Sequence, residues 1–288
     1  MNSKSVKYII ANIHGKSNYH THTFYCDGKD SPEDMVLSAI DLGFSNLGFS
    51  GHQFSVQDAD YAMSPENEVK YRADVRALQE KYGDKINIFL GIERDSCCEA
   101  TEGFQYVIGS THHIENDNTW LNIDESPHVM EDAVKEHFDG DYMAYAEAYY
   151  DFESQVLIRT RGQIVGHFDL VAVFNEGNKY FDERDSAYRK WAIRSAERLV
   201  ECYVKDKDLR VLPDGFPEEL GEVIYKTGMP IFEINTGAMA KGRRSVPYPA
   251  PFIIEHLAEM GVPFVINSDC HDRNYLNFGF SGIIDIFK

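Results

Sequence analysis

The chain has 288 residues, and 47 acidic side chains against 28 basic ones give it a formal charge of -19 at pH 7. Such an acidic surplus repels nucleic-acid phosphates and anionic lipids, so a role in binding a duplex or a membrane surface is disfavoured. Because no Pro/Gly/Ser-rich linker or repeat divides the sequence, we expect a single domain over residues 1–288 rather than two smaller ones.

The start of the chain and its cysteines point to a cellular compartment. Residues 1–7 are polar, and the apolar pair Ile9-Ile10 is too short for a signal peptide or a membrane-spanning segment. The 5 cysteines include the adjacent Cys97 and Cys98, and this odd count without a disulfide framework favours a reducing environment. We therefore expect a cytoplasmic protein, and no pattern in the sequence selects an oligomeric state.

Short apolar, β-rich runs alternate with helical stretches along the chain, a pattern typical of βα units rather than of hairpins. The predicted strands are residues 18–23, 46–50, 87–93, 106–110, 163–168, 230–235 and 263–268. The predicted helices are residues 31–43, 65–81, 142–160, 187–204, 217–227 and 249–260. The first helix has the clearest start, with Ser31 as N-cap, Pro32 at the first helical position and acidic residues in the first turn.

The acidic stretch of residues 115–139 has no clear periodicity, and we expect it to form an inserted loop over one face. The alternation of strands and helices elsewhere predicts a closed or nearly closed parallel α/β barrel, with a doubly wound open sheet as the alternative. In both architectures, ligands bind beyond the carboxyl ends of the strands.

The positions of the histidines are the most informative feature of the sequence. His20 and His22 lie in the first predicted strand, where residues two apart project from the same face, so one cation can bind both. Taken alone, this His-x-His pair is explained equally well by a solvated or core position. Imidazole combined with carboxylate is the ligand mix of zinc, manganese or iron.

Further candidate ligands follow later strands. Asp27 lies in the first βα loop, although an Asp before Gly also suits an ordinary turn. Glu93 ends an apolar run, where a buried charge is costly unless it is paired or metal-bound, so it is the best candidate for a bridging carboxylate. Histidine or aspartate also ends or follows four other predicted strands: His52, His112, His167, Asp269 and His271. Each one alone suits a hydrogen-bonded core or loop residue, but their recurrence at successive strand ends favours a common site.

The ordered set resembles the polymerase-and-histidinol-phosphatase (PHP) superfamily, whose motifs are His-x-His, a His after the second strand, a Glu, two further His and a terminal Asp-x-His. The likeness runs from His20 to His271. It is most similar to the histidinol-phosphatase branch through four motifs: Asn18-Tyr19-His20-Thr21-His22, Gly109-Ser110-Thr111-His112, Gly166-His167-Phe168-Asp169 and Glu233-Ile234-Asn235-Thr236.

This resemblance implies a distorted (β/α)7 TIM-like barrel with two or three divalent ions. The implied ligand sets are His20, His22, Glu93 and Asp269 for one ion; Glu93, His112 and His167 for a second; and Asp27, His52 and His271 for a third. Motif spacing favours His112 over the adjacent His113 as the ligand. We assign Glu93, Asp269 and His271 as catalytic residues.

The implied chemistry is phosphomonoester hydrolysis by attack of a metal-bound hydroxide on phosphorus. Cys26 and Cys270 flank proposed ligands, but neither lies in a Gly-rich phosphate loop, so a thiol nucleophile is disfavoured. Arg243 and Arg244 are candidates for binding the phosphate, with a solvated surface cluster as the alternative. Acidic side chains are candidates for meeting a substrate ammonium group, although their spacing selects none: Asp124, Glu125 and Glu176.

The leading prediction is therefore an enzyme that releases phosphate from L-histidinol phosphate in histidine biosynthesis. A broader phosphoesterase or a 3′ exonuclease is the enzymatic alternative, and the acidic charge disfavours nucleic acid as a partner. A non-catalytic, metal-binding regulatory module is the alternative from another class, and the complete set of candidate ligands argues against it.

Overall fold

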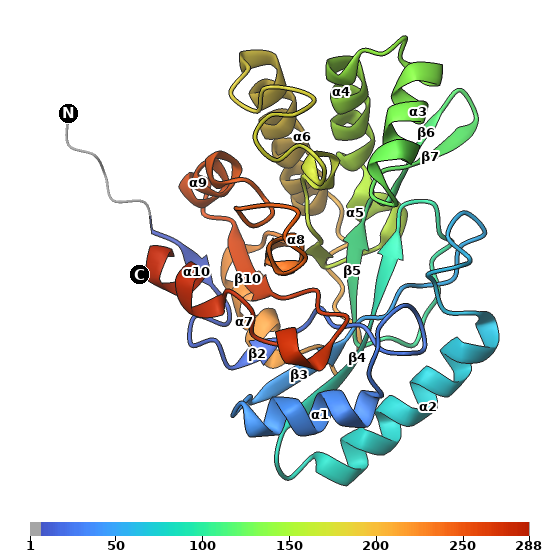
Figure 1. Cartoon of the computed structure of the whole chain (residues 1–288). Helices are drawn as coiled ribbons and strands as arrows, with labels where there is room; N and C mark the ends of the chain where they lie inside the picture. Colours follow the sequence, from blue (N-terminus) through green and yellow to red (C-terminus); the bar gives the residue numbers. More distant parts are fainter. Residues whose placement is uncertain (1–6, 288) are drawn as a thin grey trace.

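The computed structural model describes residues 7 to 287. Six of the seven predicted strands lie in one large sheet where the apolar runs predict them, and the one predicted over residues 18–23 overlaps its observed strand, Ser17–Asn18, at Asn18 alone. Residues 1–6, part of the polar start considered above, lie outside the described residues. All eight strands of the sheet are parallel, and it curls as a half-barrel with helices around it (Figure 1). The strands, in their spatial order, are β1 (Ile9–Ile10), β10 (Pro263–Asn267), β9 (Ile231–Asn235), β8 (Ile164–Val165), β5 (Tyr106–Ser110), β4 (Asn87–Asp95), β3 (Asn46–Phe49) and β2 (Ser17–Asn18).

The two ends of this sheet come together through side chains and one isolated bridge. Thr21 forms a parallel bridge with Cys270, and the Asn12 amide donates to the carbonyl oxygens of Ser17 at 2.9 Å and Ile266 at 2.7 Å. The chain is thus a distorted, TIM-like α/β barrel, which confirms the predicted fold class over the open sheet. The eighth strand, Ile9–Ile10, was not among the predicted strands, because this apolar pair was considered only as a signal segment and is too short for one.

The helices surround the sheet and mostly begin where capping signals predict them. Ser31 accepts a hydrogen bond from the Asp34 amide and Pro32 opens α1. The helices are α1 (Pro32–Asp41), α2 (Pro65–Tyr82), α3 (Pro127–His137), α4 (Tyr142–Glu153), α5 (Val156–Thr160), α6 (Ser186–Lys205), α7 (Glu218–Thr227), α8 (Gly237–Ala240), α9 (Pro251–Glu259) and α10 (Phe280–Phe287). The predicted helix over residues 142–160 is in fact two helices, since Ser154 ends α4 and Gln155 precedes α5. Among residues 7 to 287, no helix has the length and apolarity needed to cross a bilayer.

The prediction of an irregular inserted loop over residues 115–139 was wrong. This stretch completes a hairpin of β6 (His113–Asn116) and β7 (Thr119–Asn122), and it then forms α3. Asp117 and Asn118 join the two strands with positive φ angles of 48° and 61°, a conformation that Asp and Asn tolerate well. Ser126 caps α3 before Pro127, so the stretch carried the same start signal as the first helix.

A buried tyrosine fills the barrel between the strands that lead to the site. The Tyr106 hydroxyl donates to the carbonyl oxygens of Tyr19 at 2.6 Å and Phe49 at 3.0 Å. A Cβ atom at Gly48 or Gly91 would lie 2.3 or 2.2 Å from this side chain, so both strands need glycine there. Tyr106 therefore ties the ends of β2 and β3 together beneath the candidate ligands.

Candidate metal centre

Glu93, near the end of β4, is the centre of the site. Its side chain is 1 % exposed, and Ser110 donates a hydrogen bond to its Oε1 atom at 2.7 Å. Five imidazole nitrogens lie within 2.9 to 3.4 Å of its two oxygens: those of His20, His22 and His52 at Oε2, and those of His112 and His167 at Oε1. Histidines from four different strand ends thus meet at a single carboxylate.

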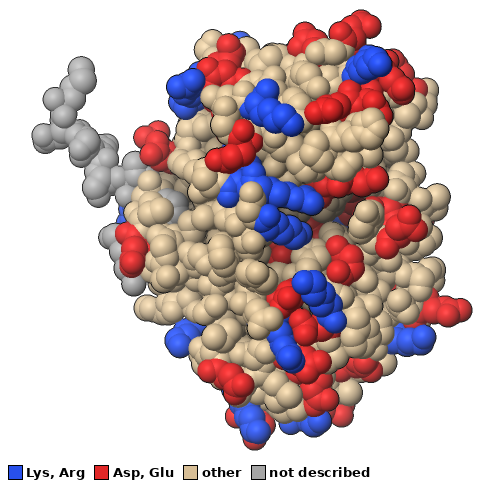
Figure 2. Space-filling view, viewed as in Figure 1, with Lys and Arg blue, Asp and Glu red and all other residues tan. Residues whose placement is uncertain are grey.

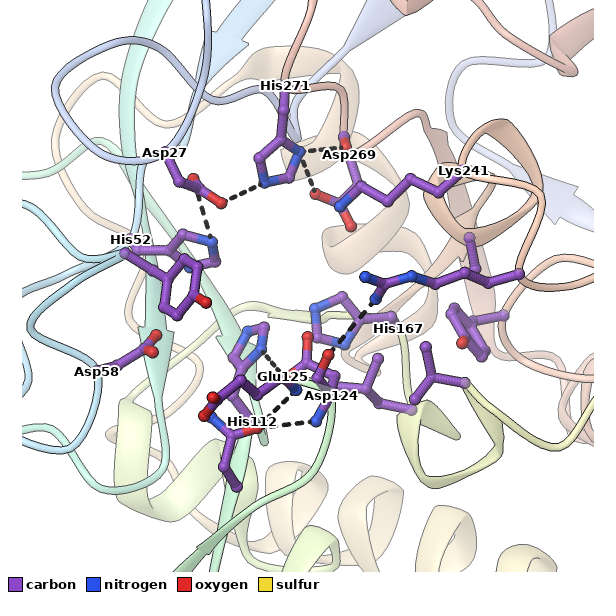
Figure 3. A pocket seen from close by; sticks show the side chains of 17 residues that line it. Asp27, His52, Asp58, His112, Asp124, Glu125, His167, Lys241, Asp269 and His271 are labelled. Atoms are coloured by element: carbon purple, nitrogen blue, oxygen red, sulfur yellow. Dashed lines mark hydrogen bonds and ion pairs between the residues drawn. The ribbon is translucent and has the colours of Figure 1, made fainter. Parts of the chain in front are cut away.

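The remaining candidate ligands complete the cluster on one side of Glu93. Asp269 Oδ1 lies 3.1 Å from His22 Nε2 and 3.6 Å from His20 Nε2. His271 Nε2 lies 3.0 Å from Asp27 Oδ2 and its Nδ1 lies 3.0 Å from the Asp269 carbonyl oxygen, as Figure 3 shows. The fold therefore brings all nine predicted ligands together.

The first histidine pair lies beyond the regular strand rather than within it. β2 ends at Asn18, and only Thr21 continues the pairing by its bridge to Cys270. His20 and His22 nevertheless face the same carboxylate, because this segment stays extended beside the end of β10.

The donor atoms fit divalent cations. Four buried atoms in the cluster have no hydrogen-bond partner among the described residues: His20 Nε2, His22 Nε2, Asp27 Oδ1 and Glu93 Oε2. Buried polar atoms are rarely left without partners, so their convergence indicates a ligand. Three groups have ligand atoms within 4.8 Å of one another: His22, Asp27, His52 and His271; His20, His22 and Asp269; and His52, Glu93 and His112. His22 thus stands between two of the ion positions that the resemblance implied.

His22 and Glu93 have the protonation states that coordination needs, whereas His20, His52 and His112, whose pKa is raised by neighbouring carboxylates against the effect of burial, would release protons when an ion binds. Burial lowers the pKa of His22 to about 3, with help from the neighbouring His271 and His52, so this imidazole is neutral near pH 7. Burial alone would raise the pKa of Glu93, but the surrounding His20, His52 and His112 hold it well below its usual range. A neutral imidazole beside an ionised carboxylate is the donor pair that binds a cation.

A second carboxylate, Glu233 in β9, orients the first histidine, and it was not predicted as a site residue. Its Oε1 atom lies 2.7 Å from His20 Nδ1, and its Oε2 atom accepts from the His167 amide at 3.0 Å. Asn235 and Asn267 donate to the two oxygens at 2.9 and 3.0 Å. A charged residue inside an apolar strand was the available signal, and such a partner fixes the tautomer of a metal ligand.

The adjacent histidines face different ways. His112 Nε2 lies 3.1 Å from Glu93, whereas His113 turns away and places Nδ1 at 3.1 Å from Asp95 Oδ2. The geometry therefore selects His112 for this cluster, because neighbouring residues in an extended segment project to opposite sides.

A pocket of about 200 Å³ opens over the cluster. Lys241, Arg243, Asp58 and Glu125 line it, and Asp58 lies across the pocket from Lys241 (Figure 3). Arg243 Nη1 donates to the main-chain carbonyl oxygen of Asp124 at 3.4 Å. Basic and acidic side chains both border the hollow on this face of the molecule, as Figure 2 shows.

Arg244 does not line this pocket, contrary to its assignment as a phosphate-binding residue. Its guanidinium is buried and pairs with the Glu183 carboxylate at 2.6 and 2.9 Å, so it stabilises the neighbouring loop. Lys241, two residues before Arg243, lines the pocket instead and was not assigned.

Two of the three acidic candidates for an ammonium partner are already engaged. Asp124 Oδ1 contacts His112 Nδ1 at 3.4 Å, and Glu176 accepts from the Ser245 amide at 3.0 Å outside the pocket lining. Glu125 is thus the remaining candidate for contacting an ammonium group, and the half-buried Asp58 also lines the pocket.

Comparisons with known proteins agree with this geometry. The model of the PHP domain matches residues 18–206. A "Probable histidinol-phosphatase" of Schizosaccharomyces pombe is 23% identical over 283 residues, which cover 92% of this chain and 82% of that protein.

Two solved structures share the fold. The "putative histidinol phosphatase hisK" of Listeria monocytogenes has a TM-score of 0.67 at 20% identity, covering 93% of this chain and 99% of that one. Histidinol phosphate phosphatase of Lactococcus lactis, complexed with zinc, L-histidinol and phosphate, has a TM-score of 0.56 at 17% identity, covering 94% and 92% of the two chains. Since the matched residues make up well over half of the sequence, the chain belongs to the PHP domain family.

Proposed function

We propose that this protein is a metal-dependent phosphomonoester hydrolase whose substrate is L-histidinol phosphate. The observation that carries the proposal is the Glu93-centred cluster of nine His, Asp and Glu side chains at the base of a pocket edged by Lys241 and Arg243. The Lactococcus lactis relative is complexed with zinc, L-histidinol and phosphate, which supports the same substrate class here.

Two or three ions, of zinc, manganese or iron, would be held by this cluster. The proposed ligands are His20, His22, Asp27, His52, Glu93, His112, His167, Asp269 and His271. When bound, divalent ions supply charge neutralisation of the phosphate and a water molecule of lowered pKa. Glu93, through its two oxygens, would hold neighbouring ions at a fixed separation.

The pocket side chains then position the phosphate. Lys241 and Arg243 balance its negative charge on the side facing solvent, and the guanidinium suits paired phosphate oxygens. Asp269 and His271 line the pocket as well as being proposed ligands, so we assign them to hold the ions and to orient the attacking water there. His271 is held for this role by Asp27 at 3.0 Å.

Two carboxylates of the pocket lining suit the other end of the substrate. In the described part of the chain, neither Asp58 nor Glu125 forms an ion pair, although both line the pocket. L-Histidinol phosphate carries an ammonium group, which such carboxylates would bind. The pocket therefore offers cationic side chains for the phosphate and carboxylates without ion pairs for the amine.

The test is phosphate release from L-histidinol phosphate by protein reconstituted with zinc or manganese, beside phenyl phosphate and a short DNA strand. Selective turnover of L-histidinol phosphate, abolished in Glu93→Gln, is the expected result. Turnover of phenyl phosphate or DNA alone would retain the metal centre and discard the substrate. If protein with ions bound turns over none of these substrates, a metal-binding regulatory module is the remaining interpretation.

The cysteines support the proposed cytoplasmic location. All 5 cysteines are free thiols, as a reducing compartment requires.

A further inference from the structure

A second cluster of metal-binding side chains lies beside the pocket but is not part of its lining. It consists of Asp95, the last residue of β4, Cys97 in the turn that follows, and His113 at the start of β6. One ligand atom from each of these residues lies within 4.8 Å of the others, and His113 Nδ1 is 3.1 Å from Asp95 Oδ2. The proposed chemistry at Glu93 uses none of these three side chains.

We propose that Asp95, Cys97 and His113 form a separate site for a borderline-soft divalent cation such as zinc. A thiolate, an imidazole and a carboxylate are the three donor types that zinc takes in proteins. Donor atoms on a tetrahedral zinc ion lie about 3.3 to 3.6 Å apart, given bonds of about 2.0 Å to nitrogen and about 2.3 Å to sulfur. The 3.1 Å between Asp95 and His113 is close to this separation, and the Cys97 sulfur lies within 4.8 Å of both donors.

The turn after β4 holds the donors in place. The Cys97 amide donates to Asp95 Oδ1 at 3.0 Å, which bends the chain so that both side chains face His113. Asp95 and His113 are buried, and Cys97 is half-buried. An ion would thus bind to a largely formed site rather than order a loop.

Solvent reaches the cluster from its Cys97 side. Cys97 and Cys98 line a cavity of about 470 Å³, together with Ser55, whose hydroxyl lies 3.2 Å from the Cys97 sulfur. The Cys98 thiol donates to the Phe54 carbonyl oxygen at 3.5 Å and is not one of the three donors, so the fourth position on the ion would be left to water. The cavity also provides the route of entry for the ion.

Binding has a defined cost at His113. The Asn122 oxygen accepts hydrogen bonds from two main-chain amides, which fixes the orientation of its side-chain amide. Asn122 Nδ2 therefore donates to His113 Nε2 at 3.2 Å. In the absence of an ion, the imidazole proton of His113 thus belongs on Nδ1. Coordination through Nδ1 moves this proton to Nε2 and gives up the contact with Asn122, while the Cys97 thiol loses its proton to solvent. One such hydrogen bond is small beside the bonds to a structural zinc ion.

The site is linked to the catalytic cluster through a main-chain contact. Asp95 Oδ2 accepts the amide of His112 at 2.9 Å, and His112 contacts Glu93. A cation on Asp95 would therefore stabilise the backbone that positions His112. This assignment does not depend on which substrate the pocket binds.

The experiment is a cobalt titration of chelator-treated full-length protein, followed by the charge-transfer absorption of a cobalt–thiolate bond. The proposed ligands around Glu93 include no cysteine, so they cannot produce this absorption. We expect the band in the wild-type protein and in Cys202→Ser, a matched control on α6. We expect its loss in Cys97→Ser, with one cobalt ion fewer bound per chain.

Cys26→Ser is the second control, because the Cys26 sulfur lies 3.6 Å from His22 Nδ1. Absence of the band, its persistence in Cys97→Ser, or its loss in Cys26→Ser would each overturn the proposal. If Cys97→Ser fails to fold, alkylation of the wild-type protein tests the proposal instead. Zinc must then protect Cys97 but not Cys202 from iodoacetamide, and equal alkylation of Cys97 with and without zinc would reject the site.

Discussion

The floor of the pocket and its rim are built differently. The floor is the Glu93-centred cluster of nine proposed ligands, most of them buried at or just beyond the ends of barrel strands. The rim consists of Asp58, Glu125, Lys241 and Arg243, which come from loops and are half-buried or exposed. The floor is held by hydrogen bonds such as that of Ser110 to Glu93, whereas Lys241, Asp58 and Glu125 form no ion pair within residues 7 to 287.

This difference implies that the floor carries out the reaction and that the rim selects the substrate. Buried donors at strand ends cannot move without disturbing the barrel, so the floor is suited to a fixed arrangement of ions. Loop side chains can change without such a cost, so the rim is suited to choosing the substrate. Substitutions in the floor should therefore affect all substrates, and those in the rim should distinguish among them.

The largest effect is expected from Glu93→Gln. An amide cannot replace the negative charge that five imidazoles surround, so ions should be lost and kcat/KM should fall about a thousandfold or more, which corresponds to several kcal/mol of lost stabilisation. Metal content and phosphate release are the measurements, with Glu222→Gln, at an exposed residue of α7 outside the pocket lining, as a charge-matched control. Retention of ions and activity in Glu93→Gln would break the proposed distinction between floor and rim.

Glu233→Gln should have the next largest effect, through His20 rather than by contact with substrate. Loss of an orienting carboxylate lowers metal affinity or activity by about 10- to 100-fold. Activity should therefore recover partly at high zinc concentration, whereas that of Glu93→Gln should not. Equal activity of Glu233→Gln and the wild-type protein at limiting zinc would show that His20 needs no such support.

Lys241→Met tests the cationic side chains of the rim. A hydrogen bond to a charged group contributes about 1.5 to 3 kcal/mol, so kcat/KM should fall about 10- to 100-fold for every phosphomonoester tested. Metal content should stay unchanged, because Lys241 is not a proposed ligand. Lys179→Met, at an exposed lysine outside the pocket lining, is the control and should behave as the wild type.

Asp58→Asn and Glu125→Gln should give the smallest and most selective effect. Ion pairs near solvent contribute up to about 1 kcal/mol each, so each change should lower kcat/KM for L-histidinol phosphate about fivefold. The same variants should turn over phenyl phosphate, which has no ammonium group, at the wild-type rate. A parallel loss on both substrates would show that these carboxylates do not select the amine.

The order of candidate residues along the chain, together with the family resemblance that it carries, predicted the barrel and the floor. Apolar runs ending in His, Asp or Glu can be recognised locally, and parallel strands bring their carboxyl ends to one edge. That reasoning anticipated the convergence of residues as distant as His20 and His271. It stopped short at Glu233, because a side chain within a strand shows its partner only when the barrel closes.

Tertiary structure alone decided the rim and the second cluster. Arg243 and Arg244 are neighbours in sequence, yet one lines the pocket and the other is buried against Glu183, since loop geometry sets the direction of each side chain. By contrast, the Asp117-Asn118 turn and the Ser126 cap are local signals that the prediction overlooked, and they convert the expected loop into a hairpin and a helix. That hairpin turns His113 toward Asp95 and Cys97, a contact that depends on packing between strands rather than on any local pattern.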